Sequence, residues 1–162
     1  LSNPNKRSEY DTKGINSNSP DDTLHENLSE KARLLYRRAK SLYSQKKYWE
    51  ASSLLDEVVK LDTKKSSYFL LLGLCQMNLP ALKRMSANNL QKAIELDAFN
   101  VEALTAMGML LMSENQTKRA EGFFRKALSM NPDHSLARKK LSEISGGETK
   151  RKSKFSLFGK KK

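Results

Sequence analysis

The fold is decided by residues 101–134, which read VEALTAMGMLLMSENQTKRAEGFFRKALSMNPDH. Small and large apolar residues stand at defined places in this stretch. They are Leu104, Met107, Gly108, Leu111, Ala120, Phe124 and Ala127, and Pro132 follows them. Much of the pattern returns upstream at a nearly fixed interval, which identifies the stretch as one unit of a repeat.

The interval between equivalent residues is 34 or 35. Pairs at 34 are Leu90/Phe124, Ala93/Ala127, Ser86/Ala120, Leu35/Phe69 and Ala39/Gly73, and pairs at 35 are Gly73/Gly108 and Ala51/Ser86. One extra residue in the second unit accounts for both intervals. We place it at Asn78-Leu79-Pro80, because proline ends a helix and a loop tolerates an insertion.

These spacings resemble the tetratricopeptide-repeat (TPR) family, most completely in residues 101–134. The other repeats are expected at about 32–65, with Thr63 in place of the usual proline, and 66–100, which departs from the pattern at Gln76 and Ala98. The resemblance implies an all-α TPR solenoid of three helix-turn-helix repeats. Gly, Ala or Ser is needed where the two helices of a repeat cross, and large residues fill the gaps beside the crossing.

A further helix is predicted after the third repeat. Asn131-Pro132 supplies an N-cap and a first-turn proline, and residues 132–145 place Ala137, Leu141 and Ile144 on one face. Gly146-Gly147 is expected to end this helix. The predicted organisation is therefore repeats over 29–134, a capping helix over 135–145 and a basic, disordered tail over 146–162.

The resemblance also implies a concave groove lined by the first helix of each repeat. The positions that map to it are Arg33, Tyr36, Lys40 and Tyr43, then Ser67, Leu70, Leu74 and Met77, then Glu102, Thr105, Met109 and Met112. Their chemistry favours an apolar or amphipathic peptide oriented by Arg33 and Lys40, because flexible Met side chains re-pack around varied segments. The alternative is that the Leu and Met residues are ordinary core.

Some TPR proteins grip the C-terminal carboxylate of a chaperone with Lys, Asn and Arg side chains. The matching places here include Tyr36, Lys40, Leu71 and Ala106, so most of that clamp is missing. The sequence therefore argues against recognition of a carboxylate tail.

Residues 1–11, LSNPNKRSEYD, resemble the end of a J-domain, which closes with Leu-Ser-(Asp/Asn)-Pro, Arg and Tyr-Asp at this spacing. All seven fixed positions match. The resemblance implies that residues 1–14 are a remnant of the last J-domain helix in a bacterial DnaJ-like protein. The His-Pro-Asp loop that stimulates a heat-shock chaperone partner would then lie upstream of Leu1. Residues 15–28 are polar and are predicted to be a linker.

The net charge of +12 is concentrated at the end of the chain, where residues 146–162 carry seven basic groups and one acidic group. The candidate contacts to an anionic surface are Lys150, Arg151, Lys152, Lys154, Phe155, Phe158, Lys160, Lys161 and Lys162. Such a segment suits an anionic membrane surface, or nucleic acid as a weaker candidate, and a solubilising tail is an equal alternative. Vesicle binding lost on deleting residues 148–162 would favour the membrane.

No catalytic, metal-binding or cofactor motif is present, so we expect no enzyme, metal or cofactor. Cys75 is the single cysteine and lies in an apolar run, which predicts a buried, quiet thiol and weakly favours a cytoplasmic setting. No apolar run is long enough to span a membrane. The predicted function is protein or peptide binding, as the client-binding part of a J-domain co-chaperone; the alternative is a scaffold or adaptor localised by its basic tail.

Overall fold

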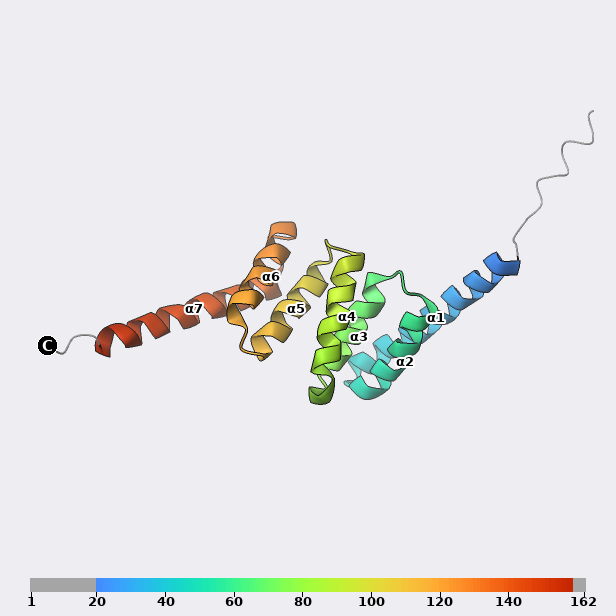
Figure 1. Ribbon diagram of the computed structural model, residues 1–162, viewed down its shortest axis with the longest axis horizontal. Coiled ribbons are helices and arrows are strands. Elements are labelled where there is room, and N and C mark those ends of the chain that lie inside the picture. Colours follow the sequence, from blue (N-terminus) through green and yellow to red (C-terminus); the bar gives the residue numbers. More distant parts are fainter. Residues whose placement is uncertain (1–19, 159–162) are drawn as a thin grey trace, which may run out of the picture.

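The computed structural model describes the backbone of residues 20–158 and the side chains of residues 23–146. Within these residues the chain is helical and contains no strand, which confirms the predicted all-α solenoid. The helices follow one another in a row with α1 and α7 at its two ends (Figure 1). They are α1 (Pro20–Ser44), α2 (Tyr48–Leu61), α3 (Ser66–Met77), the short 3₁₀ helix η2 (Pro80–Leu82), α4 (Lys83–Leu96), α5 (Val101–Ser113), α6 (Thr117–Met130) and α7 (Ser135–Phe158).

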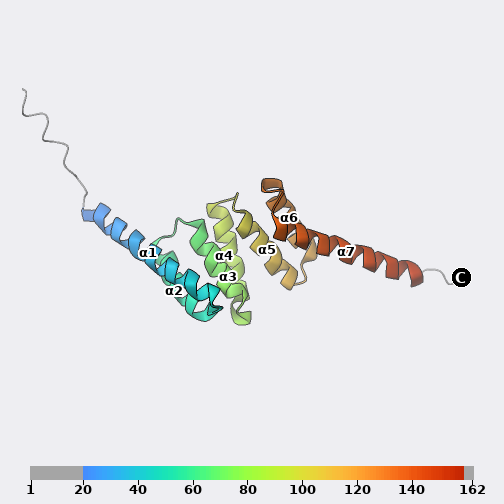
Figure 2. The same cartoon turned by 180° about the vertical axis from the view of Figure 1, so that it is seen from behind.

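Helices pair in chain order, and the pairs stack. α1 packs on α2, α3 on α4 and α5 on α6, while α2–α3, α4–α5 and α6–α7 contacts join one pair to the next. Contacts also join α1 to α3, α3 to α5 and α5 to α7, so these four helices form one side of the stack (Figure 2). The remaining helices α2, α4 and α6 form the other side.

Glycine is required at two of these crossings. A Cβ added to Gly108 would lie 2.6 Å from Cε1 of Phe124, and one added to Gly73 would lie 2.7 Å from Cγ of Leu90. In the second repeat the hydroxyl of Ser86 also donates a hydrogen bond to the carbonyl of Gly73 at 2.8 Å. The crossings predicted from the spacing of small and large residues are therefore present.

The core runs along the stack between the two rows of helices. Its largest fully buried side chains include Leu55, Leu72, Leu90, Leu104, Leu110 and Phe124. α7 closes the last repeat with Ala137 and Ile144, which are 0% and 5% exposed and belong to the same cluster as Phe124.

The turns show where the second repeat differs from its neighbours. The α1–α2 and α5–α6 turns are alike: Lys46 and Asn115 have positive φ angles of 62° and 60°, and the next amide donates to Leu42 and Leu111 respectively. In the second repeat residues 78–82 form a longer turn that includes η2. This confirms the predicted position of the extra residue.

The first helix begins earlier than predicted. Residues 20–28 belong to α1 and not to a linker, and Lys31 reaches Glu57 of α2 at 2.8 Å. Pro20 opens the helix because proline is tolerated only in the first turn. Extension from the packed part of α1 needs no new helix nucleus, so a polar segment can follow it.

The last helix differs from the first-turn role predicted for Pro132 and runs past the predicted end at 145. α7 begins at Ser135, because the Asn131 side chain accepts the amide of Asp133 at 3.1 Å and holds Pro132 in the turn. His134 then caps the helix, its Nδ1 accepting from the amide of Ala137 at 3.2 Å. α7 continues through Gly146-Gly147 to Phe158, so the glycines do not end it. Each glycine costs about 1 kcal/mol in a helix, which lowers its stability without forcing a stop.

Candidate functional site

The predicted groove residues lie on three neighbouring helices of one side of the stack. Arg33, Tyr36, Lys40 and Tyr43 are on α1, Ser67, Leu70, Leu74 and Met77 on α3, and Glu102, Thr105, Met109 and Met112 on α5. Because α1 contacts α3 and α3 contacts α5, the structure brings these three sets side by side (Figure 2). We call this surface the inner face.

The middle of the inner face is apolar. Leu70, Leu74, Met77, Met109 and Met112 are each partly exposed, and their remaining surface packs on the main core. They therefore combine a core role with an open surface. Thr105 differs from the prediction, because it is 2% exposed and its hydroxyl donates to the carbonyl of Val101 at 2.8 Å. A small side chain folded back onto its own helix offers nothing to a ligand.

The α1 end of the inner face is aromatic and cationic. The Tyr36 ring lies 4.8 Å from that of Tyr68, and the Tyr43 ring lies 5.6 Å from that of Tyr48. Burial raises the pKa of both Tyr36 and Tyr43, so both stay neutral at physiological pH. Arg33 and Lys40 are exposed beside them. Aromatic rings next to exposed cations form a polar end of the inner face.

The places of the carboxylate clamp are closed in this structure. Leu71 and Ala106 are 7% and 3% exposed and belong to the core. Neither can contact a terminal carboxylate, and Lys40 alone remains of the matching cations. Burial of these two positions adds to the sequence argument against a carboxylate clamp.

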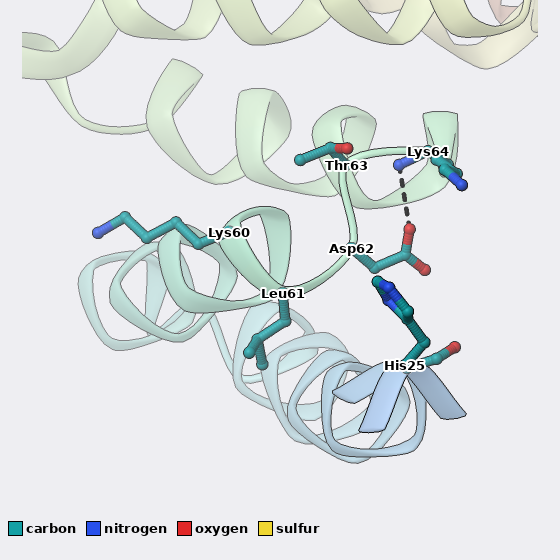
Figure 3. A pocket seen from close by; sticks show the side chains of 7 residues that line it. His25, Lys60, Leu61, Asp62, Thr63 and Lys64 are labelled. Carbon is teal, nitrogen blue, oxygen red and sulfur yellow. Dashed lines mark hydrogen bonds between the residues drawn. The ribbon is translucent and has the colours of Figure 1, made fainter. Parts of the chain in front are cut away.

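A polar cleft of about 450 Å³ lies between the start of α1 and the α2–α3 turn (Figure 3). It is lined by His25, Ser29, Lys60, Leu61, Asp62, Thr63 and Lys64. Figure 3 shows Lys60 and Lys64 pointing in opposite directions, while the Asp62 carboxylate points toward the His25 ring. The Lys64 amide donates to Asp62 at 3.0 Å. Since the two cations do not converge, we assign no anion site here.

A second, smaller pocket of about 210 Å³ lies between α2 and α4. Its lining residues are Trp49, Ser52, Ser53, Asp56, Gln76, Leu82 and Met85. Sequence reasoning missed this pocket, although it singled out Gln76 as a departure from the repeat. The signal that could have found it is the run Trp49, Ser52, Ser53 and Asp56, which falls on one stripe of a helix.

The side chains of residues 147–158 and all of residues 1–19 and 159–162 lie outside the described part of the structure. The J-domain remnant, the first part of the predicted linker and the basic contacts from Lys150 to Lys162 therefore stay predictions from the sequence. Among the described residues no helix is both long and apolar enough to cross a membrane. In the same residues no three His, Cys, Asp or Glu side chains are grouped as metal ligands.

The Cys75 thiol is buried at 0% exposure, as the apolar run predicts. Burial raises its pKa from 9.0 to about 12. At pH 8 the thiolate fraction then falls from about 10⁻¹ to about 10⁻⁴, and the thiolate is the reactive form. We expect an aromatic disulfide reagent at pH 8 to label the folded protein at least about a thousandfold more slowly than the protein unfolded in urea. Fast labelling of the folded protein would contradict the burial of Cys75. Because the chain has one cysteine, the labelling signal comes from Cys75 alone.

Comparison with known proteins agrees with this architecture. Residues 101–134 match the family model of the tetratricopeptide repeat. Sperm-associated antigen 1 of Mus musculus is 41% identical over 54 residues, which are 33% of this chain and 6% of the mouse protein. The match thus spans a small part of that relative.

Two solved structures share most of the fold. The Arabidopsis OM64 TPR domain superposes with a TM-score of 0.71 at 21% identity, covering 74% of this chain and 98% of the domain. The first TPR of Spaghetti (RPAP3), solved bound to the HSP90 peptide SRMEEVD, superposes with a TM-score of 0.70 at 18% identity, covering 75% and 95%. Residues 101–134 thus match the tetratricopeptide repeat, and the chain has the fold of a TPR solenoid.

Proposed function

We propose that the inner face binds an apolar or amphipathic segment of another protein. The observation that carries this proposal is the row of partly exposed Leu and Met side chains across α3 and α5, next to exposed cations on α1. The Spaghetti TPR, which has the same fold, is bound to a peptide, and this supports peptide binding by such a surface. Flexible Met side chains suit segments of varied sequence.

The charge of the inner face suggests the polarity of the bound segment. Arg33 and Lys40 are exposed at the α1 end, whereas Leu74 and Met109 lie further along the face. An apolar segment with acidic residues at one end would place its carboxylates beside α1, because exposed charges steer and orient a ligand. The closed positions Leu71 and Ala106 make a side-chain carboxylate a better fit than a clamped C-terminus.

The test uses labelled peptides of equal length whose affinity is measured by fluorescence anisotropy. One alternates Leu with Glu at one end, a second replaces Glu by Lys, and a third is wholly polar. We expect the Leu/Glu peptide to bind most tightly. The double variant Lys40→Glu, Arg33→Glu should weaken it roughly tenfold, since each exposed pair contributes up to about 1 kcal/mol.

The matched control is Lys118→Glu with Lys126→Glu on α6, which changes the net charge equally on the other side of the stack. If both double variants weaken the peptide equally, the effect is one of net charge and the site on the inner face is wrong. Equal affinity for the polar peptide would also contradict the proposal.

The finer role we propose is client binding for a J-domain co-chaperone. What supports it is the match of residues 1–11 to the end of a J-domain. In such a protein the inner face would hold the client, and the J-domain would recruit the heat-shock chaperone. The coding sequence upstream of Leu1 tests this directly, because it should encode a His-Pro-Asp loop in the same frame.

A further inference from the structure

The pocket between α2 and α4 lies away from the inner face. α2 contacts α3 and α3 contacts α4, but within residues 20–158 no backbone contact joins α2 to α4. The space between the two outer helices is therefore open and has α3 as its floor. On α3, Gln76 and Leu74 are two positions apart, which places them about 200° apart around the helix axis. Gln76 thus faces the pocket side while Leu74 belongs to the inner face.

Gln76 is an unusual floor residue. It is 0% exposed, its Oε1 accepts a hydrogen bond from Nδ2 of Asn89 at 2.8 Å, and its Nε2 has no acceptor in the described residues. Such an unpaired buried donor destabilises a fold by about 1–3 kcal/mol. Leu42 and Leu111 occupy the equivalent position in the first and third repeats. The polar residue is therefore specific to this pocket and is not needed by the repeat.

The rim of the pocket is both apolar and acidic. Trp49 and Met85 are 66% and 48% exposed. Asp56 is half-buried, and no Lys or Arg nitrogen lies within 4.0 Å of its carboxylate among the described residues. Burial raises the pKa of Asp56, and the nearby charge of Lys60 lowers it by a smaller amount. The charge of Lys60 therefore offsets only part of the desolvation of the carboxylate. A second cation brought to Asp56 would offset the rest.

The geometry points to an arginine side chain of a partner protein as the occupant of this pocket. Its guanidinium lies beside Asp56 and its aliphatic stem lies between Trp49 and Met85, over the buried side chain of Gln76. The pocket volume of about 210 Å³ fits one anchoring side chain, since small-molecule sites begin near ~300 Å³. Trp49 and Asp56 are separated by about 10 Å along α2, which a long side chain can span. Arginine suits the site better than lysine, because its planar group can pair with a carboxylate through two parallel hydrogen bonds.

The first experiment titrates the full chain with Nα-acetyl-arginine N-methylamide and follows the fluorescence of Trp49, the single tryptophan. The citrulline derivative has nearly the same shape without the charge, and the leucine derivative tests an apolar occupant. We expect the arginine derivative to bind about tenfold or more tightly than either, because a charged hydrogen bond contributes about 1.5–3 kcal/mol. Equal or tighter binding of the citrulline or leucine derivative overturns the proposal.

Two variants locate the contact within the pocket. Asp56→Asn should reduce the preference for arginine over citrulline to about one, whereas Glu57→Gln, the next acid on α2, should leave it unchanged. Gln76→Leu should leave the preference for arginine over citrulline unchanged, because the Gln76 side chain is 0% exposed and does not reach the ligand. If Asp56→Asn keeps the preference in a folded protein, the assignment is wrong. Circular dichroism at 222 nm confirms that each variant is folded.

Discussion

Phe124→Ala is expected to lower the free energy of unfolding by about 3–5 kcal/mol, the range for removing a buried phenylalanine. Phe124 is 0% exposed, and its Cε1 lies 2.6 Å from where a Cβ of residue 108 would be, so its removal leaves a cavity beside a glycine that has no side chain to fill it. Domains of this size are stable by about 5–15 kcal/mol, so the loss is a large share of the total. Urea unfolding followed by circular dichroism at 222 nm measures it.

The control for this variant is Phe99→Ala, because Phe99 is 76% exposed and its removal should change stability by no more than about 0.5 kcal/mol. A double-mutant cycle checks the contact itself. Gly108→Ala alone should destabilise by about 1–3 kcal/mol through overpacking, and much less when Phe124 is already alanine. A loss below about 1 kcal/mol for Phe124→Ala, or additive effects in the cycle, would contradict the packing described above.

The same contact explains why the fold was predictable from the sequence. Close crossings admit only Gly, Ala or Ser, and the residue that fills the adjacent gap must be large, so Gly108 with Phe124 and Gly73 with Leu90 recur at the repeat interval. This restriction is local and steric, so it can be recognised in a single sequence. The capping side chains Ala137 and Ile144 follow the same logic, because they cover the apolar end that the third repeat leaves open.

Helix ends were less predictable because their determinants are weaker. Residues 23–27 are exposed, so no apolar period marks the start of α1. Pro132 looked like a first-turn proline, but the backbone amides of Asp133 and Ala137 donate hydrogen bonds to the side chain of Asn131 and the ring of His134, and α7 starts at Ser135. A helix that starts at Pro132 and one that starts at Ser135 differ in stability by about 1 kcal/mol, the contribution of one cap. Sequence patterns do not resolve so small a difference.

The inner face could be predicted in part and the outer pocket could not. The position of a residue on the first helix of a repeat indicates its side of the stack, which places Leu74 and Met109. It does not indicate how deeply the side chain is buried. Thr105, which was predicted to line the groove, is only 2% exposed. The pocket depends on how far α2 stays from α4, and that distance is set by the packing of both on α3. The sequence offers two signals for it: Gln76, a polar residue at an apolar position, and the stripe of α2 that begins at Trp49 and ends at Asp56.

Gln76→Leu is expected to stabilise the protein by about 1–3 kcal/mol, the cost of an unpaired buried donor. Leucine is accepted at the equivalent positions 42 and 111, and Asn89 is only partly buried, so water can replace its lost partner. The midpoint of urea unfolding measures the gain. The control is Gln91→Leu on α4, an exposed residue whose change should stay within about 0.5 kcal/mol.

The sign of this effect decides how Gln76 is to be understood. A loss of stability would mean that the amide pair with Asn89 holds α3 to α4, and that Gln76 is a structural residue. A gain means that the folded state carries a destabilising donor at one repeat out of three. Stabilising substitutions are easy to find. A destabilising residue that a protein keeps is therefore expected at a site where function depends on it. A gain in stability would therefore show that Gln76 is not kept for packing alone, because replacing a residue kept for packing would lower the stability.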